Sequence, residues 1–360
     1  DSAVVLGVVF AVLARRRPRE AVWTARPALV VTGAWLLWCH AYFGAALPNT
    51  LHTKLGTNPA LPLNGMRYVW RFLSAYALWP FLALGLLLAL TRRWRPDAAL
   101  TLTAAVCLVW MLEVIAVGGD FMEFRFLVPV LPLLVLVVLG IARDALGGAL
   151  LRRATPALVA SALLLVAVST RHAAVSRGVT ADRTLDSIAA LGDFYGVYPD
   201  HDFSRIGRGL ARDLEGVPVT LALHAVGAIP WYSRIPTVDQ YGLNDPAIAR
   251  DGLSAPRHEM RPGHQRQLPL RVLRERGVSL VLGHPTLVPI GHLRDPRQLE
   301  DERDWLRSCI AFDPDAPREV TVVALPVDDA QAVLAWVLTP TPALETRMRA
   351  RGWETMTLAR

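Results

Sequence analysis

Long apolar runs dominate the first half of the chain. Six of them approach the length that a helix needs to cross a bilayer, which is about 20 residues. They cover residues 3–13, 27–46, 68–90, 98–117, 126–142 and 157–170. The first run is short and arginines follow it, so we expect it to be the remainder of a span that begins before Asp1. The pattern predicts a polytopic α-helical membrane domain of about six spans over residues 1–170, with its N-terminal spans missing.

The second half has the shorter apolar patterns of a globular domain. Its β-branched runs predict buried strands, and the segments between and after them have the apolar spacing of helices. The strands are predicted at 217–223, 278–283 and 320–325, and the helices at 205–214, 265–276, 299–308 and 329–338. Strands that alternate with helices are typical of an α/β fold. We therefore predict a soluble α/β domain over residues 171–360.

The charge is distributed unevenly along this chain, which is 53% hydrophobic and only 19% charged, with a net charge of +7. Residues 1–170 carry 15 basic and 7 acidic side chains, whereas residues 171–360 carry 23 and 24. The excess lies among the apolar runs, which favours a role in membrane topology over nucleic-acid binding. The three cysteines offer neither a disulfide framework nor a CxxC metal site.

Arginine clusters occupy alternate connections between the apolar runs, after the first, third and fifth. They comprise Arg15, Arg16, Arg17, Arg19, Arg92, Arg93, Arg95, Arg143, Arg152 and Arg153. The positive-inside bias makes these connections cytoplasmic. Loops 47–67 and 118–125, and everything after residue 170, are then expected on the outer face. This topology predicts a multi-pass protein of the plasma membrane whose C-terminal domain is extracytoplasmic.

Two acids and an arginine occupy the short outer-face loop 118–125. Burying a carboxylate near lipid is costly unless the group has a partner or a task, and this applies to Asp120 and Glu123. Arg125 is close enough in sequence to pair with either acid. These residues are candidates for a catalytic site, and the alternative is that they only cap and anchor the helix ends.

The longer outer-face loop contains Lys54, the only lysine of the chain, against 37 arginines. A compact ammonium group in such an arginine-rich chain suggests a phosphate ligand, and the alternative is chance. Asn49 and His52 lie beside it with further hydrogen-bonding groups.

The exterior segment 227–250 is dense in glycine, proline and aromatic residues. Trp231 and Tyr232 are suited to stacking on a sugar face. The polar residues Asp239, Asn244 and Asp245 are suited to binding sugar hydroxyls. The alternative for the last two is that they form the turn before a proline.

A histidine-containing stretch follows this segment. His258, Glu259 and His264 do not have a recognised zinc spacing. The sequence specifies no cofactor, and it leaves a divalent cation open.

Three motifs in this order resemble a known family. They are 47-LPNTLHTKLG-56, 118-GGDFMEFRFLVPVLP-132, and 239-DQYGLNDPAIAR-250 followed by His258 and 284-HP-285. The stretch from about residue 27 to 290 resembles the actinobacterial polytopic glycosyltransferases of the GT-C superfamily, closest to the mycobacterial terminal β-(1→2)-arabinofuranosyltransferase group. The chain departs from the family pattern at Leu51 and His52, and at Glu123 and Phe124.

The resemblance implies a polyprenyl-phosphate-linked sugar as donor, a cell-envelope glycan as acceptor, and a lipid bilayer as the setting. It implies that Asn49, His52, Lys54 and Arg125 bind the donor phosphate and sugar, with Asp120 and Glu123 in supporting catalytic roles. The acceptor would then meet Trp231, Tyr232, Asp239, Asn244, Asp245 and His258. In this superfamily the first exterior loop supplies the principal catalytic carboxylate, which places that group before Asp1. The resemblance suggests arabinofuranose as the sugar, while the sequence itself leaves the sugar and the acceptor open.

Two other functional classes stay open. A transporter or flippase of lipid-linked sugars would also hold polar groups at membrane depth, usually near the midplane and in repeated halves. A non-catalytic cell-envelope scaffold would not depend on its loop acids. The position of the polar groups on one face, without a visible repeat, favours the glycosyltransferase.

Overall fold

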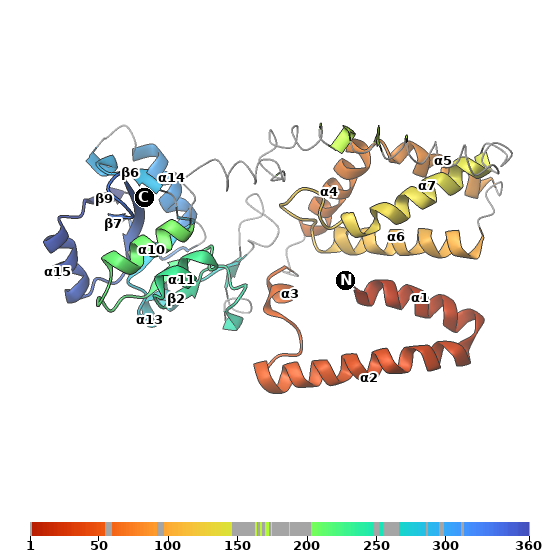
Figure 1. Ribbon diagram of the computed structural model, residues 1–360, viewed down its shortest axis with the longest axis horizontal. Coiled ribbons are helices and arrows are strands. Elements are labelled where there is room, and N and C mark those ends of the chain that lie inside the picture. The colour runs from red at the N-terminus through yellow and green to blue at the C-terminus, as the bar shows by residue number, and fades with distance from the viewer. Residues whose placement is uncertain are drawn as a thin grey trace. The chain divides into compact units, whose positions relative to one another are not determined.

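The computed structural model of the chain describes residues 2–54, 60–91, 97–145, 163, 166–167, 170–172, 174, 187, 203–247, 252–254, 266–285, 287–294, 299–310 and 313–359. The chain forms two compact units. The first comprises Asp1–Pro48 and Thr57–Ala190, and the second comprises Asn49–Gly56 and Leu191–Arg360. Figure 1 shows the helices of the first unit and the mixed sheet of the second.

The first unit consists of helices that gather around α6. Its elements are α1 (Ser2–Arg16), α2 (Pro18–Phe43), α4 (Leu61–Ala75), α5 (Trp79–Leu90), α6 (Ala98–Ala116), the 3-10 helix η1 (Val128–Val130) and α7 (Leu131–Ala145). α6 contacts α1, α4 and α7. A Cβ atom on Gly65 would clash with the backbone oxygen of Ile115, so α4 and α6 pack almost backbone to backbone. Buried Phe72, Leu127 and Leu134 fill the core of this unit.

The prediction of about six membrane spans is wrong. Among the described residues one helix, α6, is long and apolar enough to cross a membrane, with 19 residues and a mean hydropathy of 2.1. A second crossing exists only if α4 and α5 are counted as one span, and these two helices are bent by 99° to each other. The apolar helix Val128–Arg143 is shorter than a span, and most of the sixth run lies outside the described residues.

Local backbone chemistry explains why apolar composition overestimated the spans. The third run is interrupted where Ala77 takes a positive φ of 52°, directly before α5 with its Pro80. A proline near the start of a helix is favourable because its missing N–H has no partner there, so Pro80 starts a new helix. The second run is part of α2, which has 26 residues and is long enough to cross a membrane but not apolar enough.

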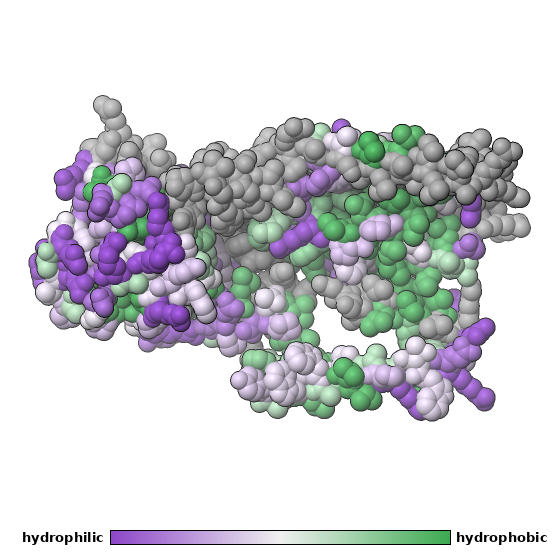
Figure 2. Space-filling view, viewed as in Figure 1, coloured by the Kyte–Doolittle hydropathy of each residue, from purple (hydrophilic) through white to green (hydrophobic). Residues whose placement is uncertain are grey.

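The apolar surface of the first unit nevertheless supports association with a membrane. Large hydrophobic side chains are exposed on several of its helices, such as Leu37 of α2 at 73% and Leu90 of α5 at 73%. Figure 2 shows apolar side chains gathered over the helices of the first unit and hydrophilic ones over the second. Soluble proteins rarely expose such extended apolar areas unless another phase or partner covers them.

The second unit is built on a seven-stranded mixed sheet in the order β2-β1-β5-β8-β7-β9, with β6 paired to β8. Its strands are β1 (Leu221–Leu223), β2 (Thr237–Asp239), β5 (Leu280–Gly283), β6 (Leu287–Pro289), β7 (Glu319–Pro326), β8 (Gln331–Val337) and β9 (Thr355–Ala359). β1 is parallel to β2 and to β5, and the remaining pairs are antiparallel. A separate short hairpin joins β3 (Leu253–Ser254) and β4 (Arg266–Gln267).

Helices cover both faces of this sheet. The helical elements of the second unit as a whole are α3 (Asn49–Lys54), α10 (Phe203–Asp213), α11 (Ala228–Ser233), α13 (Leu270–Glu275), η4 (His292–Arg294), α14 (Leu299–Ile310) and α15 (Pro342–Arg351), and those that pack on the sheet core include α10, α11, α13, α14 and α15. Leu221 and Leu223 of β1 pack with buried residues of α10, α11 and α15. Ala222, between them, packs with residues of α13 and α14 on the other face. This alternation follows from the two-residue period of a strand.

One predicted helix is a strand. Residues 329–338 were expected to be helical, but β8 occupies Gln331–Val337 and pairs with β5, β6 and β7. Because helices cover the sheet on both sides, nearly every residue of β8 is buried. A central strand therefore lacks the alternation of polar and apolar residues that identifies a half-buried strand.

Candidate functional site

The loop that follows α6 is held tightly against α4. Gly118 and Gly119 have φ angles of 88° and 74°, which favour glycine. A Cβ atom at Gly119 would lie 2.7 Å from the Cβ of Tyr68, so the backbone touches that side chain. Asn64 Nδ2 also donates to the Gly118 carbonyl at 3.0 Å. The sequence thus bends sharply at the end of an apolar helix, and the following acids are directed into the protein.

Asp120 is buried beside Arg125. The residue is only 4% exposed, and both carboxylate oxygens accept from the guanidinium, with Arg125 Nη2 at 3.0 Å from Oδ1 and Nε bonded to Oδ2. The guanidinium also lies over the Phe121 and Phe126 rings, at 5.4 and 5.3 Å from their centroids. A bidentate pair and two aromatic contacts fix the orientation of Arg125. Its side chain remains 41% exposed, so the cation is accessible.

Glu123 is buried beside a histidine and a tyrosine. The residue is 2% exposed, and its Oε1 lies 3.5 Å from Nδ1 of His172. The Tyr76 hydroxyl lies 2.5 Å from the same nitrogen, and the Tyr76 and His172 rings are stacked with an interplanar angle of 12°. Arg171 Nε donates to the Ala75 carbonyl at 2.7 Å, which holds this segment against the end of α4.

These contacts favour a chemical role over helix capping for Asp120. A capping acid accepts backbone N–H groups, as Asp97 does at the start of α6, where it accepts from Leu100 N at 2.8 Å. Asp120 instead accepts from the side chain of Arg125. The loop presents two buried carboxylates, each beside a partly exposed cation or titratable base. Such a pair of sites can bind an anion and position a proton-transfer group.

The sequence did not identify Tyr76 and His172 as members of this cluster. Tyr76 lies in an apolar run that was expected to be a continuous span, although the break between α4 and α5 is directly beside it. His172 lies 96 positions further along the chain. The only signal for it in the sequence was a histidine shortly after the last apolar run.

The predicted donor residues of the longer loop lie in α3, which belongs to the second unit. Asn49 is half-buried at the start of that helix. The side chains of His52 and Lys54 lie outside what the structure describes. Their contacts therefore stay a prediction.

Two aromatic residues of the predicted acceptor site are exposed on α11. Trp231 is 65% exposed and Tyr232 is 43% exposed. The guanidinium of Arg234 lies over the Trp231 ring at 4.9 Å, and that of Arg208 lies over the Tyr232 ring at 5.1 Å. An exposed aromatic face beside a cation is suited to a polar ring or an anionic sugar chain.

Asp239 is engaged in the loop after β2. The residue is 5% exposed, and its carboxylate accepts from the backbone N–H of Tyr241 at 2.9 Å, Gly242 at 3.2 Å and Asn244 at 2.8 Å. Burial raises the pKa of Asp239, although these three donors lower it. Asp239 therefore shapes this loop, and the prediction that it binds a sugar hydroxyl has no support in its contacts.

Asp245 also has structural partners. Its carboxylate accepts from Ala247 N at 2.9 Å and forms an ion pair with Arg276. These contacts agree with the alternative that Asn244 and Asp245 form the turn before Pro246. Asn244 is exposed, and His258 lies outside the described residues. Among the side chains that the structure describes, no group of three metal-ligating residues converges.

Residues 197–330 match a domain of unknown function, DUF8728. No curated protein matches the chain. No solved structure matches it either. The match falls in the second unit and names no activity.

Proposed function

We propose that this protein is a membrane glycosyltransferase that moves a sugar from a polyprenyl-phosphate donor to a cell-envelope glycan. The observation that carries the proposal is the cluster of Asp120, Glu123, Arg125 and His172 at the end of α6, the apolar helix of spanning length. A lipid phosphate presents an anion at that depth, and a partly exposed arginine held by a buried carboxylate is a suitable receptor for it.

The chemistry follows from the charges. In glycosyl transfer the bond from the sugar carbon to the phosphate oxygen breaks and its electron pair stays on the phosphate. Arg125 stabilises that leaving group, and Asp120 fixes the orientation of the guanidinium. The acceptor hydroxyl forms the new bond and loses its proton to a base. By resemblance to the family, a carboxylate of an exterior loop would act as that base or stabilise an oxocarbenium-like transition state, while Glu123 and His172 support the site.

The orientation of α6 fits this reaction. Arg92, Arg93 and Arg95 precede α6 in the sequence, and the positive-inside bias places that end in the cytoplasm. The loop after α6 is then on the outer face of the plasma membrane. We extend the proposal to the second unit, which would also lie outside, with Trp231 and Tyr232 exposed for stacking on the acceptor glycan.

The test uses the full-length protein in membranes, with a radiolabelled polyprenyl-phosphoryl pentose and a glycan acceptor. We expect Asp120→Asn and Arg125→Gln to lower transfer by about 100-fold, because a positioned charge at the leaving group is removed. A matched control is Asp213→Asn, since Asp213 is also buried and bonded to an arginine, Arg212, at 2.8 Å. Its transfer rate per folded molecule should stay at the wild-type level.

Two results would count against the proposal. Unchanged transfer in both Asp120→Asn and Arg125→Gln would show that these two residues do not form the site of the reaction. Absence of transfer by the wild-type protein from any polyprenyl-linked sugar would instead favour a flippase or a scaffold. A flip assay with fluorescent lipid-linked sugar in vesicles separates those two classes.

A further inference from the structure

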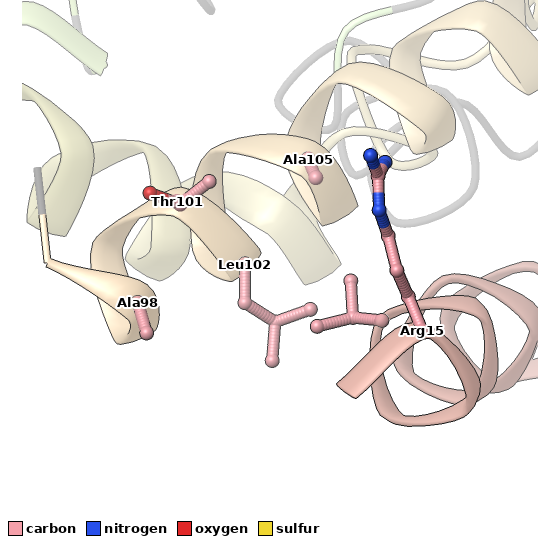
Figure 3. A pocket seen from close by; sticks show the side chains of 6 residues that line it. Arg15, Ala98, Thr101, Leu102 and Ala105 are labelled. Carbon is pink, nitrogen blue, oxygen red and sulfur yellow. The ribbon is translucent and has the colours of Figure 1, made fainter. Parts of the chain in front are cut away.

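A second feature of the first unit is a pocket between α1 and α6, far along α6 from the acidic loop. It has a volume of about 430 Å³ and is lined by Val12, Arg15, Ala98, Thr101, Leu102 and Ala105. Figure 3 shows Arg15 reaching away from α1 toward the turn of α6 that carries Ala105. Most of the wall is apolar, and Arg15 is the one charged residue among the described residues that line it.

Arg15 has no partner among the described residues. Neither a hydrogen bond nor an ion pair to its guanidinium is present in the part of the chain that the structure describes, whereas its neighbour Arg17 is paired with Glu20 at 3.0 Å. The acid at this end of α6, Asp97, accepts the Leu100 N–H as an N-cap. An unpaired guanidinium beside an apolar pocket is complementary to an anion that carries its own apolar part.

The position of the pocket narrows the class of anion. It lies at the first two turns of α6, the helix that is long and apolar enough to span a membrane. The end of such a helix lies at the level of the lipid headgroups. Its backbone N–H groups add a partial positive charge there. Leu108 and Leu112 of α6, on the same helix face as Thr101 and Ala105, are 55% and 53% exposed, so apolar surface continues along α6 from the pocket for an acyl chain.

We propose that this pocket binds the headgroup of an anionic membrane phospholipid. The phosphate pairs with Arg15, and the upper part of the acyl chain lies against Val12, Leu102 and Ala105. The site is independent of glycosyl transfer, since it requires only that α6 lies in a bilayer. It would anchor α1 beside α6 in the leaflet that faces the arginine-rich connections, where anionic lipids attract basic residues.

The experiment measures lipid binding to the full-length protein in a neutral detergent. The probes are short-chain phosphatidylglycerol and phosphatidylcholine, and the readout is native mass spectrometry with a titration of bound lipid. We expect phosphatidylglycerol to bind at least about fivefold more tightly than phosphatidylcholine. Arg15→Gln should weaken phosphatidylglycerol by about fivefold, because one basic residue near a lipid surface contributes about 1 kcal/mol. Inorganic phosphate at millimolar concentration should not displace the lipid.

Two further variants separate a pocket from general attraction. Arg26→Gln is the matched control, because Arg26, like Arg15, is an exposed arginine of the first unit, but it lies over Trp23 and not in the pocket. It should leave the affinity within about twofold. Ala105→Phe fills the pocket without changing the charge and should weaken phosphatidylglycerol as much as Arg15→Gln.

The proposal is overturned by any of four results. Three are equal affinity for the two lipids, equal weakening by Arg26→Gln and Arg15→Gln, and no effect of Ala105→Phe. The fourth is displacement of the lipid by inorganic phosphate, which would make the pocket a site for simple anions. Should Arg15→Gln fail to fold, as judged by its elution volume, Ala105→Phe provides the same decision.

Discussion

Two loops of this protein carry buried acids, and they use them in opposite ways. In the loop after α6, the carboxylate of Asp120 is bonded to a half-exposed arginine side chain. In the loop after β2, the carboxylate of Asp239 is bonded to three backbone N–H groups. Both acids are about equally buried, at 4% and 5% exposed. Burial alone therefore does not distinguish an acid of a candidate site from an acid that stabilises a turn. The hydrogen-bond partner distinguishes them, because it is a side chain for Asp120 and the backbone for Asp239.

The largest expected effect concerns activity at the first loop. Glu123→Gln should lower sugar transfer by about 100-fold, because the charge that holds His172 in place is removed. A matched control is Glu302→Gln, since Glu302 is 3% exposed and pairs with His292 in the second unit. Membrane transfer assays at equal protein level measure both variants. Equal losses in the two variants would mean that buried glutamate–histidine pairs act only through stability.

The next effect concerns stability at the second loop. Asp239→Ala should destabilise the second unit by about 3 kcal/mol, because three N–H groups of the loop, one of them buried and two part-buried, lose their acceptor. Asn244→Ala, at an exposed side chain of the same loop, should cost less than about 0.5 kcal/mol. Urea unfolding followed by tryptophan fluorescence measures both. A large loss of transfer with unchanged stability in Asp239→Ala would make this acid part of a site.

A smaller effect concerns the backbone that positions Asp120. Gly119→Ala should destabilise the first unit by about 2 kcal/mol, because the new methyl group meets Tyr68 and the φ angle is positive. Gly216 also has a positive φ, of 72°, but among the described residues other than its chain neighbours no atom lies within 4 Å of the place that a methyl group would take there. Gly216→Ala should therefore cost only about 1 kcal/mol. Thermal unfolding in detergent compares them, and equal costs would show that the contact with Tyr68 is loose.

The smallest expected effect is the pH dependence of stability that arises from Asp328, another acid in a turn. The Ala330 N–H, then Gln331 N–H and Arg205, lower the pKa of Asp328 below its ordinary value. A lowered folded-state pKa contributes stability above the unfolded pKa, and this is lost as pH falls through the folded pKa. For Asp239 the pKa is raised, so its contribution is present at low pH and lost as pH rises.

Asp328→Asn should therefore reduce the loss of stability below about pH 4, by less than about 1 kcal/mol because solvent screens this surface group. Asp239→Asn should change the dependence in the opposite direction. Urea unfolding between about pH 3 and about pH 6 measures both slopes on either side of the ordinary aspartate pKa. Slopes of the same sign would contradict the stated effect of burial on Asp239.

The elements that sequence patterns identified are those with a distinctive composition, such as a long apolar run or a short run of β-branched residues. The apolar run 98–117 is α6, and the predicted strands 278–283 and 320–325 contain or lie within β5 and β7. The strand β8 was missed because burial on both faces removes the polar alternation. The remaining spans were overestimated because composition does not reveal that Ala77 breaks the helix or that α7 begins only at Leu131.

The sequence by itself determined where the apolar segments and the acidic residues occur, because hydrophobicity and charge are properties of each residue type. It identified Asp120, Glu123 and Arg125 as a group because they lie within six residues. Folding was needed to bring together Tyr76 and His172, which are 96 positions apart, beside Glu123, and to turn Asp239 toward its own backbone. The physical reason is that a carboxylate takes the partners that the folded chain brings within hydrogen-bond distance, and local sequence does not specify them.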